Sequence, residues 1–285
     1  MAANILINST YVVVPHLAGW IRDDCDERDA EFDIHNSPLA STKVIPDCDN
    51  RKYFLEISEQ INMPSCTACS GADALEAGLV HALVVRGTSL DEAKKIVPNL
   101  SRMFAWYWGR SFMPKSMTDN DESGCFNRLI MEVIARFGLP PENLWPYDKK
   151  ILAPYKKPRS VVRPSITAQR AALKYRSSNF YNIPSKNKPS LVSGIDVALS
   201  AGCNVVWGTV VGTNFTEYQG GVINVPSDPF AGHAMVLCGK KGSAYWCRNS
   251  WSKNWGLDGY CLVSQDLVTW SGSSSFWVLV PKAVK

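Results

Sequence analysis

Two cysteines, Cys66 and Cys69, stand three residues apart in PSCTACSGADALEAG (64–78), where a stretch with helical spacing begins. A Cys-x-x-Cys pair serves three kinds of chemistry: a thiol–disulfide couple, half of a zinc site, or a nucleophilic thiolate beside a bystander. A thiol directly before a helix is favoured as a thiolate, because unpaired N–H groups and the helix dipole stabilise negative charge. The spacing alone leaves all three open.

His233 is the one of four histidines for which the sequence suggests a partner. The segments HAMVLCG and AYWCRNSW are expected to form a hairpin through the short loop KKGS. If the turn centres on Lys241, three cross-strand pairs follow on one face. The expected pairs are Leu237 with Tyr245, Met235 with Cys247, and His233 with Asn249.

An asparagine beside a histidine accepts the ring N–H and determines which nitrogen carries the proton. The other ring nitrogen is then free to act as a base toward a nucleophile. Trp251, two positions after Asn249, would shield that hydrogen bond from water. The alternative interpretation is a polar strand pair at the end of a sheet, with no chemical role.

The part of the chain that carries Cys66 is expected to be helical. Apolar residues recur with helical spacing from 67 to 85, and Ser65 is the expected N-cap. Two further helices are expected at 91–106 and 126–138.

The part that carries His233 and Asn249 is expected to consist of strands separated by turns that contain glycine. The expected elements are strands at 204–212, 233–239, 244–251 and 259–265, preceded by a helix at 189–202. A helical half followed by a β-rich half indicates an α+β protein with two lobes, and clefts between lobes commonly hold sites. The expected domains are an N-terminal arm at 1–56 with a strand at 10–14, a helical lobe at 57–155, and a β-rich lobe at 156–285.

The composition of this 285-residue chain narrows its partners. Its net charge is +4, and the basic stretch 149–175 is interrupted by prolines and apolar residues, so no nucleic-acid partner is expected. There is no run of 18 apolar residues and no positive n-region before the N-terminal apolar stretch. We therefore expect no membrane segment and a cytoplasmic or non-secreted protein. Nine cysteines is an odd number, and most are expected to be buried, reduced thiols. The oligomeric state is left open.

The C-terminal segment GHAMVLCG…YWCRNSWSKNWGLDGYCLV resembles the papain-like cysteine peptidases, in which these short motifs occur in the same order. The matching groups are Gly232–His233–Ala234, Tyr245–Trp246, Asn249–Ser250–Trp251, Trp255–Gly256 and Gly259–Tyr260. GCFNRLIMEVIARFGLPPENLWPYD (124–148) resembles the wall, helix and turn of that family. GWIRDDCDERD (19–29) resembles its bacterial-type branch, and no inhibitory propeptide is recognisable.

The resemblance implies a Cys-His-Asn triad and helps to select the cysteine. The family's local pattern, laid onto CTAC, would make Cys69 the nucleophile. The family also carries a glutamine six residues before its nucleophile, whose side-chain N–H helps to bind the oxyanion. Gln60 lies six residues before Cys66, whereas Met63 lies six before Cys69. Cys66 is therefore the expected nucleophile, with a thiol pKa well below about 8.5.

The resemblance also implies a set of substrate-binding residues: Ser123, Gly124, Cys125, Gly232 and Trp251. The glycine pair that would hydrogen-bond an extended substrate is Gly124–Cys125 here, so a side chain at 125 would narrow that wall or bring another thiol near the cleft. The other departures from the family pattern are Thr67 after the nucleophile, Asn62–Met63–Pro64 before it, and Ser252 after the Asn-Ser-Trp run.

The implied protein has a papain-like two-lobed α+β fold, a helical lobe and a sheet or barrel-like lobe with the active site in the cleft between them. It would cleave a peptide or protein substrate through a covalent thioester acyl-enzyme, with no metal or cofactor. One alternative is a papain-like scaffold that is a catalytically weak or inactive structural or binding protein. A zinc site of Cys66, Cys69, Cys125 and a histidine lacks a second close ligand pair, and a thiol oxidoreductase lacks its βαβ context. The regulatory hypotheses are a Cys66–Cys69 disulfide, obstruction of the cleft by the 1–56 arm, and obstruction by residues 40–56 as a built-in inhibitor.

Overall fold

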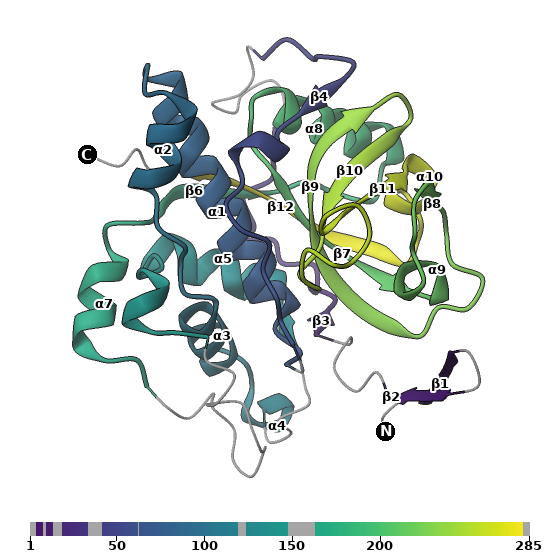
Figure 1. The fold of residues 1–285 in the computed structure, drawn as a ribbon, viewed down its shortest axis with the longest axis horizontal. Helices are drawn as coiled ribbons and strands as arrows, with labels where there is room; N and C mark the ends of the chain where they lie inside the picture. The colour runs from purple at the N-terminus through teal and green to yellow at the C-terminus, as the bar shows by residue number, and fades with distance from the viewer. Residues whose placement is uncertain are drawn as a thin grey trace.

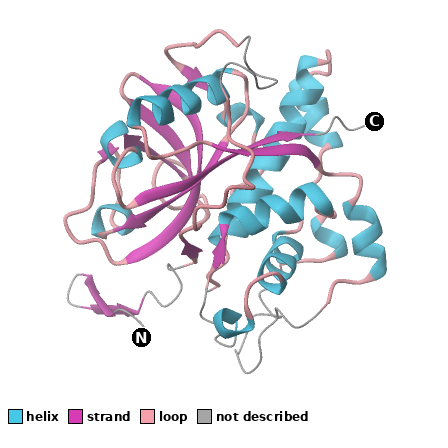
Figure 2. Ribbon diagram, turned by 180° about the vertical axis from the view of Figure 1, so that it is seen from behind, coloured by secondary structure: helices cyan, strands magenta, loops and turns pink. Residues whose placement is uncertain are grey.

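The computed structural model describes residues 4–7, 10–13, 19–33, 42–61, 63–118, 124–147 and 163–281. Helices α1, α2, α3, α5 and α7 gather on one side, and the strands of a large sheet lie on the other (Figure 1, Figure 2). Helices α8, α9 and α10 lie on the same side of the molecule as the sheet (Figure 1). The predicted α+β class is therefore confirmed. The predicted boundary between the lobes, at residue 155, lies outside the described residues.

The helical side is built around α1 (Cys66–Val85), which confirms the helix predicted at 67–85. All residues from Cys66 to Val80 are buried. By length and composition alone α1 could cross a membrane, but most of it is buried against α3, α5 and the sheet. Because a helix that is apolar all round is also what a large core requires, the apolar character of α1 fits its place in this core.

Two helices replace the single one predicted at 91–106, namely α2 (Leu90–Ile96) and α3 (Arg102–Ser111). Pro98 explains the break, because a proline disfavours helical conformation in the preceding residue and cannot donate a helical hydrogen bond. Val97 is accordingly extended, with φ −86° and ψ 113°.

The helices predicted at 126–138 and 189–202 are confirmed as α5 and α8. The remaining described helices are α4 (Lys115–Thr118), α5 (Asn127–Arg136), α7 (Ile166–Ala172), α8 (Lys188–Ser200), α9 (Thr213–Thr216), α10 (Gln265–Val268), and the 3₁₀ turns η1 (Arg51–Tyr53) and η2 (Glu142–Leu144).

The large sheet has the strand order β6-β12-β7-β9-β10-β11-β8, with β4 paired to β9 beside this path. Its strands are β4 (Cys48–Asp49), β6 (Ser177–Asn182), β7 (Val205–Val211), β8 (Val222–Ile223), β9 (Ala231–Lys241), β10 (Ala244–Arg248), β11 (Tyr260–Ser264) and β12 (Ser273–Pro281). The four predicted strands are confirmed as β7, β9, β10 and β11, and β4, β6, β8 and β12 were not predicted. Along β7 and β9 side chains alternate between two cores: Val206 and Val236 join the core around α1, whereas Trp207 and Leu237 join the core on the other face.

The hairpin of β9 and β10 does not have the predicted register. Tyr245 pairs with Lys240 rather than with Leu237, and Cys247 pairs with Leu237 rather than with Met235. The register also changes by one residue within the hairpin, between the pair Trp246–Gly239 and the pair Cys247–Leu237.

Two local features explain this difference. Gly242 has a φ of 58° and occupies the turn itself, so the turn is centred later than predicted. Cys238 is the extra residue of a β-bulge in β9, and its carbonyl accepts the N–H of Asn50. A one-residue shift moves every side chain to the other face, so the bulge returns Asn249 to the face of His233, which it meets diagonally instead of directly.

The N-terminal strands form two smaller sheets. The hairpin of β1 (Asn4–Ile7) and β2 (Thr10–Val13) confirms the strand predicted at 10–14. β3 (Trp20–Ile21) pairs in parallel with β5 (Cys125–Phe126) and also contacts β7 and β9. β3 therefore lies between the helical side and the sheet (Figure 1).

Candidate active site

Cys66 is the first residue of α1 and lies where the helical side meets the sheet. Its side chain is fully buried, and the backbone N–H of Ala234 in β9 donates to Cys66 Sγ at 3.4 Å. Ser65 occupies the predicted N-cap position, but its hydroxyl makes no capping hydrogen bond. Tyr147 donates its hydroxyl proton to the Gln60 carbonyl at 2.8 Å, so the Ser65 hydroxyl donates to the Tyr147 oxygen at 2.7 Å. The Ser65 side chain thus braces the loop before Cys66 and leaves the first N–H groups of α1 uncapped.

His233 and Asn249 are joined by a hydrogen bond of 2.7 Å between His233 Nε2 and Asn249 Oδ1. The backbone N–H of Ser250 donates to the same oxygen at 2.8 Å, which identifies it as the amide oxygen, since an amide nitrogen does not accept. His233 Nε2 must therefore carry the ring proton. Nδ1 is then the accepting nitrogen, and it has no hydrogen-bond partner within the described part of the chain. The Trp251 ring covers the imidazole, with 4.6 Å between ring centroids.

Gln60 is held beside this pair by Ser250. The Ser250 hydroxyl donates to Gln60 Oε1 at 2.7 Å, and the backbone N–H of Gln60 donates to the Ser250 carbonyl at 2.9 Å. Gln60 Nε2 donates to the Met63 carbonyl at 3.1 Å, so the amide nitrogen faces the loop that leads to Cys66. Ser250 thus orients both Asn249 and Gln60. In the sequence Ser250 is recognisable only as part of the Asn-Ser-Trp motif, although its place directly after Asn249 was a signal.

The expected substrate wall differs from the prediction. Ser123 lies outside the described residues. The Gly124–Cys125 backbone follows the prediction in presenting an N–H for an extended chain, since the Cys125 N–H donates to the Gly19 carbonyl at 2.9 Å. The Cys125 side chain turns into the helical core, where a Cβ atom on Gly109 of α3 would lie 3.1 Å from Cys125 Sγ. The Cys125 side chain therefore does not narrow the wall, and its thiol lies in the helical core, near enough to Cys66 for a charge on that sulfur to act on it.

The N-terminal segment Gly19–Ile21 occupies the space beside Cys66. A Cβ atom on Gly19 would lie 2.7 Å from Cys66 Sγ, so only a glycine fits against the sulfur. The ring of Trp20 is buried beside Cys66, and the Trp20 carbonyl lies against Gly232, where a Cβ atom would be only 2.6 Å away. Gly232 and Cys66, both predicted site residues, therefore contact the protein's own N-terminal chain.

The segment that covers Cys66 belongs to the suggested N-terminal arm 1–56 but lies outside the suggested segment 40–56. Residues 40 and 41 of the suggested 40–56 segment lie outside the described residues. The rest of it runs beside the sheet, where β4 pairs with β9, and passes η1. The obstruction comes instead from residues 19–21, which the sequence analysis used only as a family resemblance.

The residues after Ile21 anchor this covering segment to α5 and β12. Arg128 donates to both carboxylate oxygens of Asp29, with a shortest distance of 2.6 Å, and to the Asp24 carbonyl. Asp23 accepts the indole N–H of Trp277 at 2.7 Å and the backbone N–H of Arg128 at 3.3 Å. Burial raises the pKa of Asp23 to about 6, against the lowering effect of these donors.

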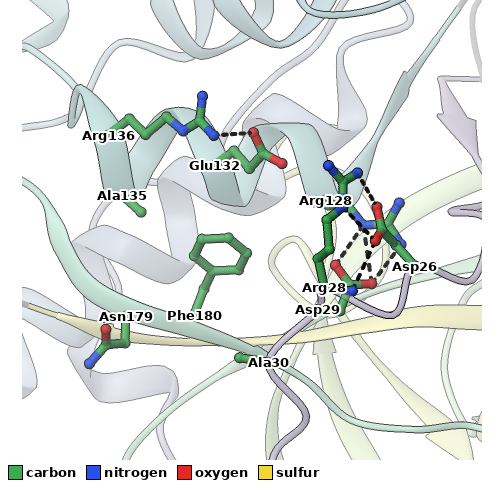
Figure 3. Close-up of a pocket in the computed structure, with 10 residues that line it drawn as sticks. All are labelled: Asp26, Arg28, Asp29, Ala30, Arg128, Glu132, Ala135, Arg136, Asn179 and Phe180. Atoms are coloured by element: carbon green, nitrogen blue, oxygen red, sulfur yellow. Dashed lines mark hydrogen bonds and ion pairs between the residues drawn. The ribbon is translucent and has the colours of Figure 1, made fainter.

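A cavity of about 410 Å³ lies beside this anchor, between the arm, α5 and β6 (Figure 3). Each arginine that lines it already has an acidic partner: Arg28 with Asp26, Arg128 with Asp29, and Arg136 with Glu132. The cavity therefore has no uncompensated arginine for an anionic ligand.

Burial dominates the ionisation of both central groups. It raises the pKa of the Cys66 thiol to about 12, although the backbone of Ala234 acts in the opposite direction. It lowers the pKa of His233 to about 4, while the hydrogen bond to Asn249 acts against this. The expected low thiol pKa is therefore wrong for this arrangement, because the covering segment removes water from the sulfur. With the site covered, both groups are neutral near pH 7.

A buried ion pair joins α1 to the strand that leads to Asn249. Arg248 Nε donates to Asp73 Oδ2 at 2.8 Å, and Ser58 donates to the other oxygen of Asp73 at 2.6 Å. Arg248 also donates to the carbonyls of Leu55 and Glu56. This network, which the sequence analysis missed, ties together the three segments that carry Cys66, Asn249 and Gln60.

The remaining thiol hypotheses gain no geometric support. Cys69 Sγ lies 3.9 Å from Ser65 Oγ, and burial raises the Cys69 pKa to about 12. All nine cysteines fall within the described ranges, and all are free thiols. In the same ranges no group of three or more His, Cys, Asp or Glu side chains is placed to hold a metal ion.

Comparisons with known proteins identify the family of the chain. A family model described as "Papain family cysteine protease" matches residues 117–276. An uncharacterized peptidase C1-like protein of Acanthamoeba polyphaga mimivirus is 28% identical over 287 residues, which cover 92% of this chain and 86% of the relative.

Two solved structures share the fold. Xylellain, a cysteine protease from Xylella fastidiosa, has a TM-score of 0.73 at 23% identity, with 95% of this chain and 97% of that chain covered. Procathepsin B from Trypanosoma congolense has a TM-score of 0.70 at 15% identity, with 99% and 94% covered. The predicted papain-like, two-lobed fold is therefore confirmed.

Proposed function

Because the chain belongs to the papain family of cysteine proteases and is thus a peptide-bond hydrolase, we propose that Cys66, His233 and Asn249 are its catalytic triad. The observation that carries this proposal is that Asn249 Oδ1 accepts two hydrogen bonds, one from His233 Nε2 and one from the Ser250 N–H. It holds the proton on His233 Nε2 and leaves Nδ1 as a base.

In the proposed reaction, His233 Nδ1 takes the thiol proton and the Cys66 sulfur attacks the carbonyl carbon of a peptide bond. His233 then gives that proton to the leaving amine, and a thioester acyl-enzyme remains. Water, activated by His233, releases the acid and restores the thiol. The N–H of Ala234, which donates to Cys66 Sγ, supports this assignment because it holds the sulfur next to the strand that carries His233.

The backbone N–H of Cys66 and the side-chain N–H of Gln60 are the proposed donors to the oxyanion. Two facts support them: the uncapped first turn of α1 and the orientation of the Gln60 amide by Ser250. Losing one such donor typically lowers the rate by about 10²–10³-fold. The substrate is a peptide or protein.

The test is hydrolysis of a fluorescently labelled denatured protein by Cys66→Ala and by Cys69→Ala, a matched change of a buried cysteine on the same helix. We expect Cys66→Ala to reduce turnover by at least about 10⁴-fold and Cys69→Ala to retain most of it. The opposite pattern would assign the nucleophile to Cys69.

A second candidate, an inactive papain-like scaffold, is favoured by one observation: Cys66 is fully buried under Gly19 and Trp20 with a raised thiol pKa. Trp20→Ala separates the two candidates. If uncovering the site produces no hydrolysis of any protein substrate, the scaffold function is the correct one.

A further inference from the structure

Ser58 lies in a short segment outside the named helices and strands, segment 55–60, which ends at the proposed oxyanion donor Gln60. The Ser58 side chain is buried, and its hydroxyl donates to Asp73 Oδ1 at 2.6 Å. Its backbone carbonyl accepts the N–H of Ser252 at 3.3 Å. Two residues before Gln60, the segment is therefore fastened on one side to α1 and on the other to the chain that follows β10.

Asp73 is a well-fixed acceptor for the Ser58 hydroxyl. It is 2% exposed and lies on α1 seven residues after Cys66, which is about two helical turns. Its second oxygen, Oδ2, accepts from Arg248 Nε at 2.8 Å, so both carboxylate oxygens are engaged. Hydrogen bonds to an ionised carboxylate are shorter and roughly twice as strong as those between neutral groups. The Ser58 hydroxyl is therefore held in a defined position relative to the helix that begins at Cys66.

Arg248 holds the beginning of segment 55–60 in a similar way. It donates to the carbonyl of Leu55 at 3.4 Å and to the carbonyl of Glu56. A guanidinium has five N–H donors in a fixed fork, so one side chain holds the two carbonyls and the carboxylate of the ion pair in a defined geometry. The ion pair therefore fixes the segment at its beginning through Arg248 and near its end through Ser58.

The same ion pair has a second hydroxyl partner in Tyr260 of β11. Arg248 donates to the Tyr260 hydroxyl at 3.0 Å, and the two residues pair across β10 and β11. Tyr260 is thus bound to the ion pair from the sheet, whereas Ser58 is bound to it from the segment that ends at Gln60. Loss of either hydroxyl leaves the ion pair in place, so Ser58 and Tyr260 provide a matched comparison.

The hydrogen bond from Ser58 affects the spacing of the two proposed oxyanion donors. One donor, the Cys66 N–H, belongs to α1, and the other is the side-chain N–H of Gln60. Ser250 binds Gln60 from the sheet side, and Ser58 supplies the link from this segment to α1. Such donors must lie about 2.7–3.1 Å from the oxyanion, and a misplacement of about 1 Å can cost about 10²-fold in rate. Both donors can therefore reach one oxygen only if the link between α1 and Gln60 is kept.

On the basis of the proposed function, we propose that Ser58 is a positioning residue for the oxyanion donors. By tying segment 55–60 to Asp73, it holds the Gln60 side-chain N–H at the distance from the Cys66 N–H that a single oxyanion requires. Ser58 is buried and acts through Gln60, not on the substrate. Its hydroxyl therefore stabilises the transition state and does not contribute to peptide binding.

The first test compares Ser58→Ala with Tyr260→Phe in the full-length chain. Each variant removes one hydroxyl from the ion pair, so urea unfolding should show a similar loss of stability in both. With a labelled protein substrate, Ser58→Ala should lower kcat by about 10²-fold and leave KM nearly unchanged, as expected for an interaction made only in the transition state. Tyr260→Phe should leave both constants unchanged.

The second test measures the link without catalysis. Hydrogen exchange followed by mass spectrometry reports the opening of segment 55–60, where the backbone N–H of Gln60 donates to the Ser250 carbonyl. Exchange in the peptide that contains Gln60 should be about tenfold faster in Ser58→Ala than in the wild type. In Tyr260→Phe it should be unchanged.

The two tests separate this proposal from the proposed function. Equal kcat in a folded Ser58→Ala variant and the wild type, or equal losses of kcat in Ser58→Ala and Tyr260→Phe, would overturn the positioning role. Equal exchange rates in the two variants would overturn it as well. If the wild type cleaves no protein, the peptidase mechanism is wrong, and faster exchange in Ser58→Ala alone would still show that Ser58 holds Gln60 in place.

Discussion

At the scale of single residues, Asn249 has the most defined contribution. One amide oxygen accepts both the His233 ring and the Ser250 N–H, so the imidazole cannot change its tautomer without losing a buried hydrogen bond. Trp251 covers the ring and keeps that bond away from water. A neutral, oriented base is what proton transfer from a thiol requires.

Asn249→Ala should therefore lower kcat by about 10²-fold with little change in KM, because it affects proton transfer and not peptide binding. Hydrolysis of a labelled protein substrate measures both constants, and the pH profile of kcat should also shift. Asn254→Ala, at an exposed position five residues later, is the matched control and should leave both unchanged. An unaltered kcat in Asn249→Ala would remove Asn249 from the triad.

At the scale of elements, the junction of α1 with the sheet holds the site together, and it contains several buried ionisable side chains. Asp73 pairs with Arg248, and one turn further along α1 Glu76 accepts the N–H of Leu100 at 2.5 Å. Burial, together with the nearby carboxylate of Asp73, raises the pKa of Glu76 to about 8. Glu76 is therefore protonated in the folded protein at neutral pH.

This predicts a specific pH dependence of stability. The Glu76 pKa rises from 4.5 when unfolded to about 8 when folded, so the folded state binds the proton more tightly. The contribution of Glu76 to stability is complete below about pH 4.5 and is lost as the pH rises toward 8. Glu76→Gln keeps an acceptor for Leu100 without the ionisation.

Glu76→Gln should consequently be more stable than the wild type at pH 8, by about 1–3 kcal/mol, with a smaller difference at pH 5. Urea unfolding at the two pH values measures this. Glu92→Gln, an exposed change near the start of α2, is the control. Equal stability of Glu76→Gln and wild type at pH 8 would mean that Glu76 is ionised in the folded state.

At the scale of the whole molecule, the N-terminal arm decides whether the site is accessible. Gly19 and Trp20 cover Cys66, and Asp23 accepts the indole N–H of Trp277 in β12. Asp29 pairs with Arg128 of α5 (Figure 3). Since the covering raises the thiol pKa, ionisation of Cys66 and docking of the arm oppose each other.

Weakening the anchor should therefore uncover the thiol. Arg128→Gln removes the charge-assisted hydrogen bonds to Asp29 and should raise the rate of Cys66 alkylation by limiting iodoacetamide about tenfold, read by peptide mapping. Arg136→Gln, which changes a mostly exposed side chain on the same helix that pairs with Glu132, should leave the rate unchanged. Equal rates in both variants would show that this anchor does not hold the arm closed.

The sequence by itself determined the elements whose cause is local. Helical spacing gave α1 and α5, strand patterns gave β7, β9, β10 and β11, and the order of short motifs led to the candidates Cys66, His233, Asn249 and Gln60. The break at Pro98 was also encoded locally but was not recognised. Local periodicity is sufficient for such elements because each depends on residues a few positions apart.

Only the tertiary structure decided the features that depend on distant segments. The bulge at Cys238 brings Asn249 to the face of His233. The Cys238 carbonyl accepts the N–H of Asn50, which lies far away in the sequence. The Cys66 pKa depends on burial by Gly19 and Trp20, and the direction of Cys125 depends on space beside Gly109. Burial and register are properties of the packed chain: the types of the residues allow them, and only the neighbours that folding supplies determine them.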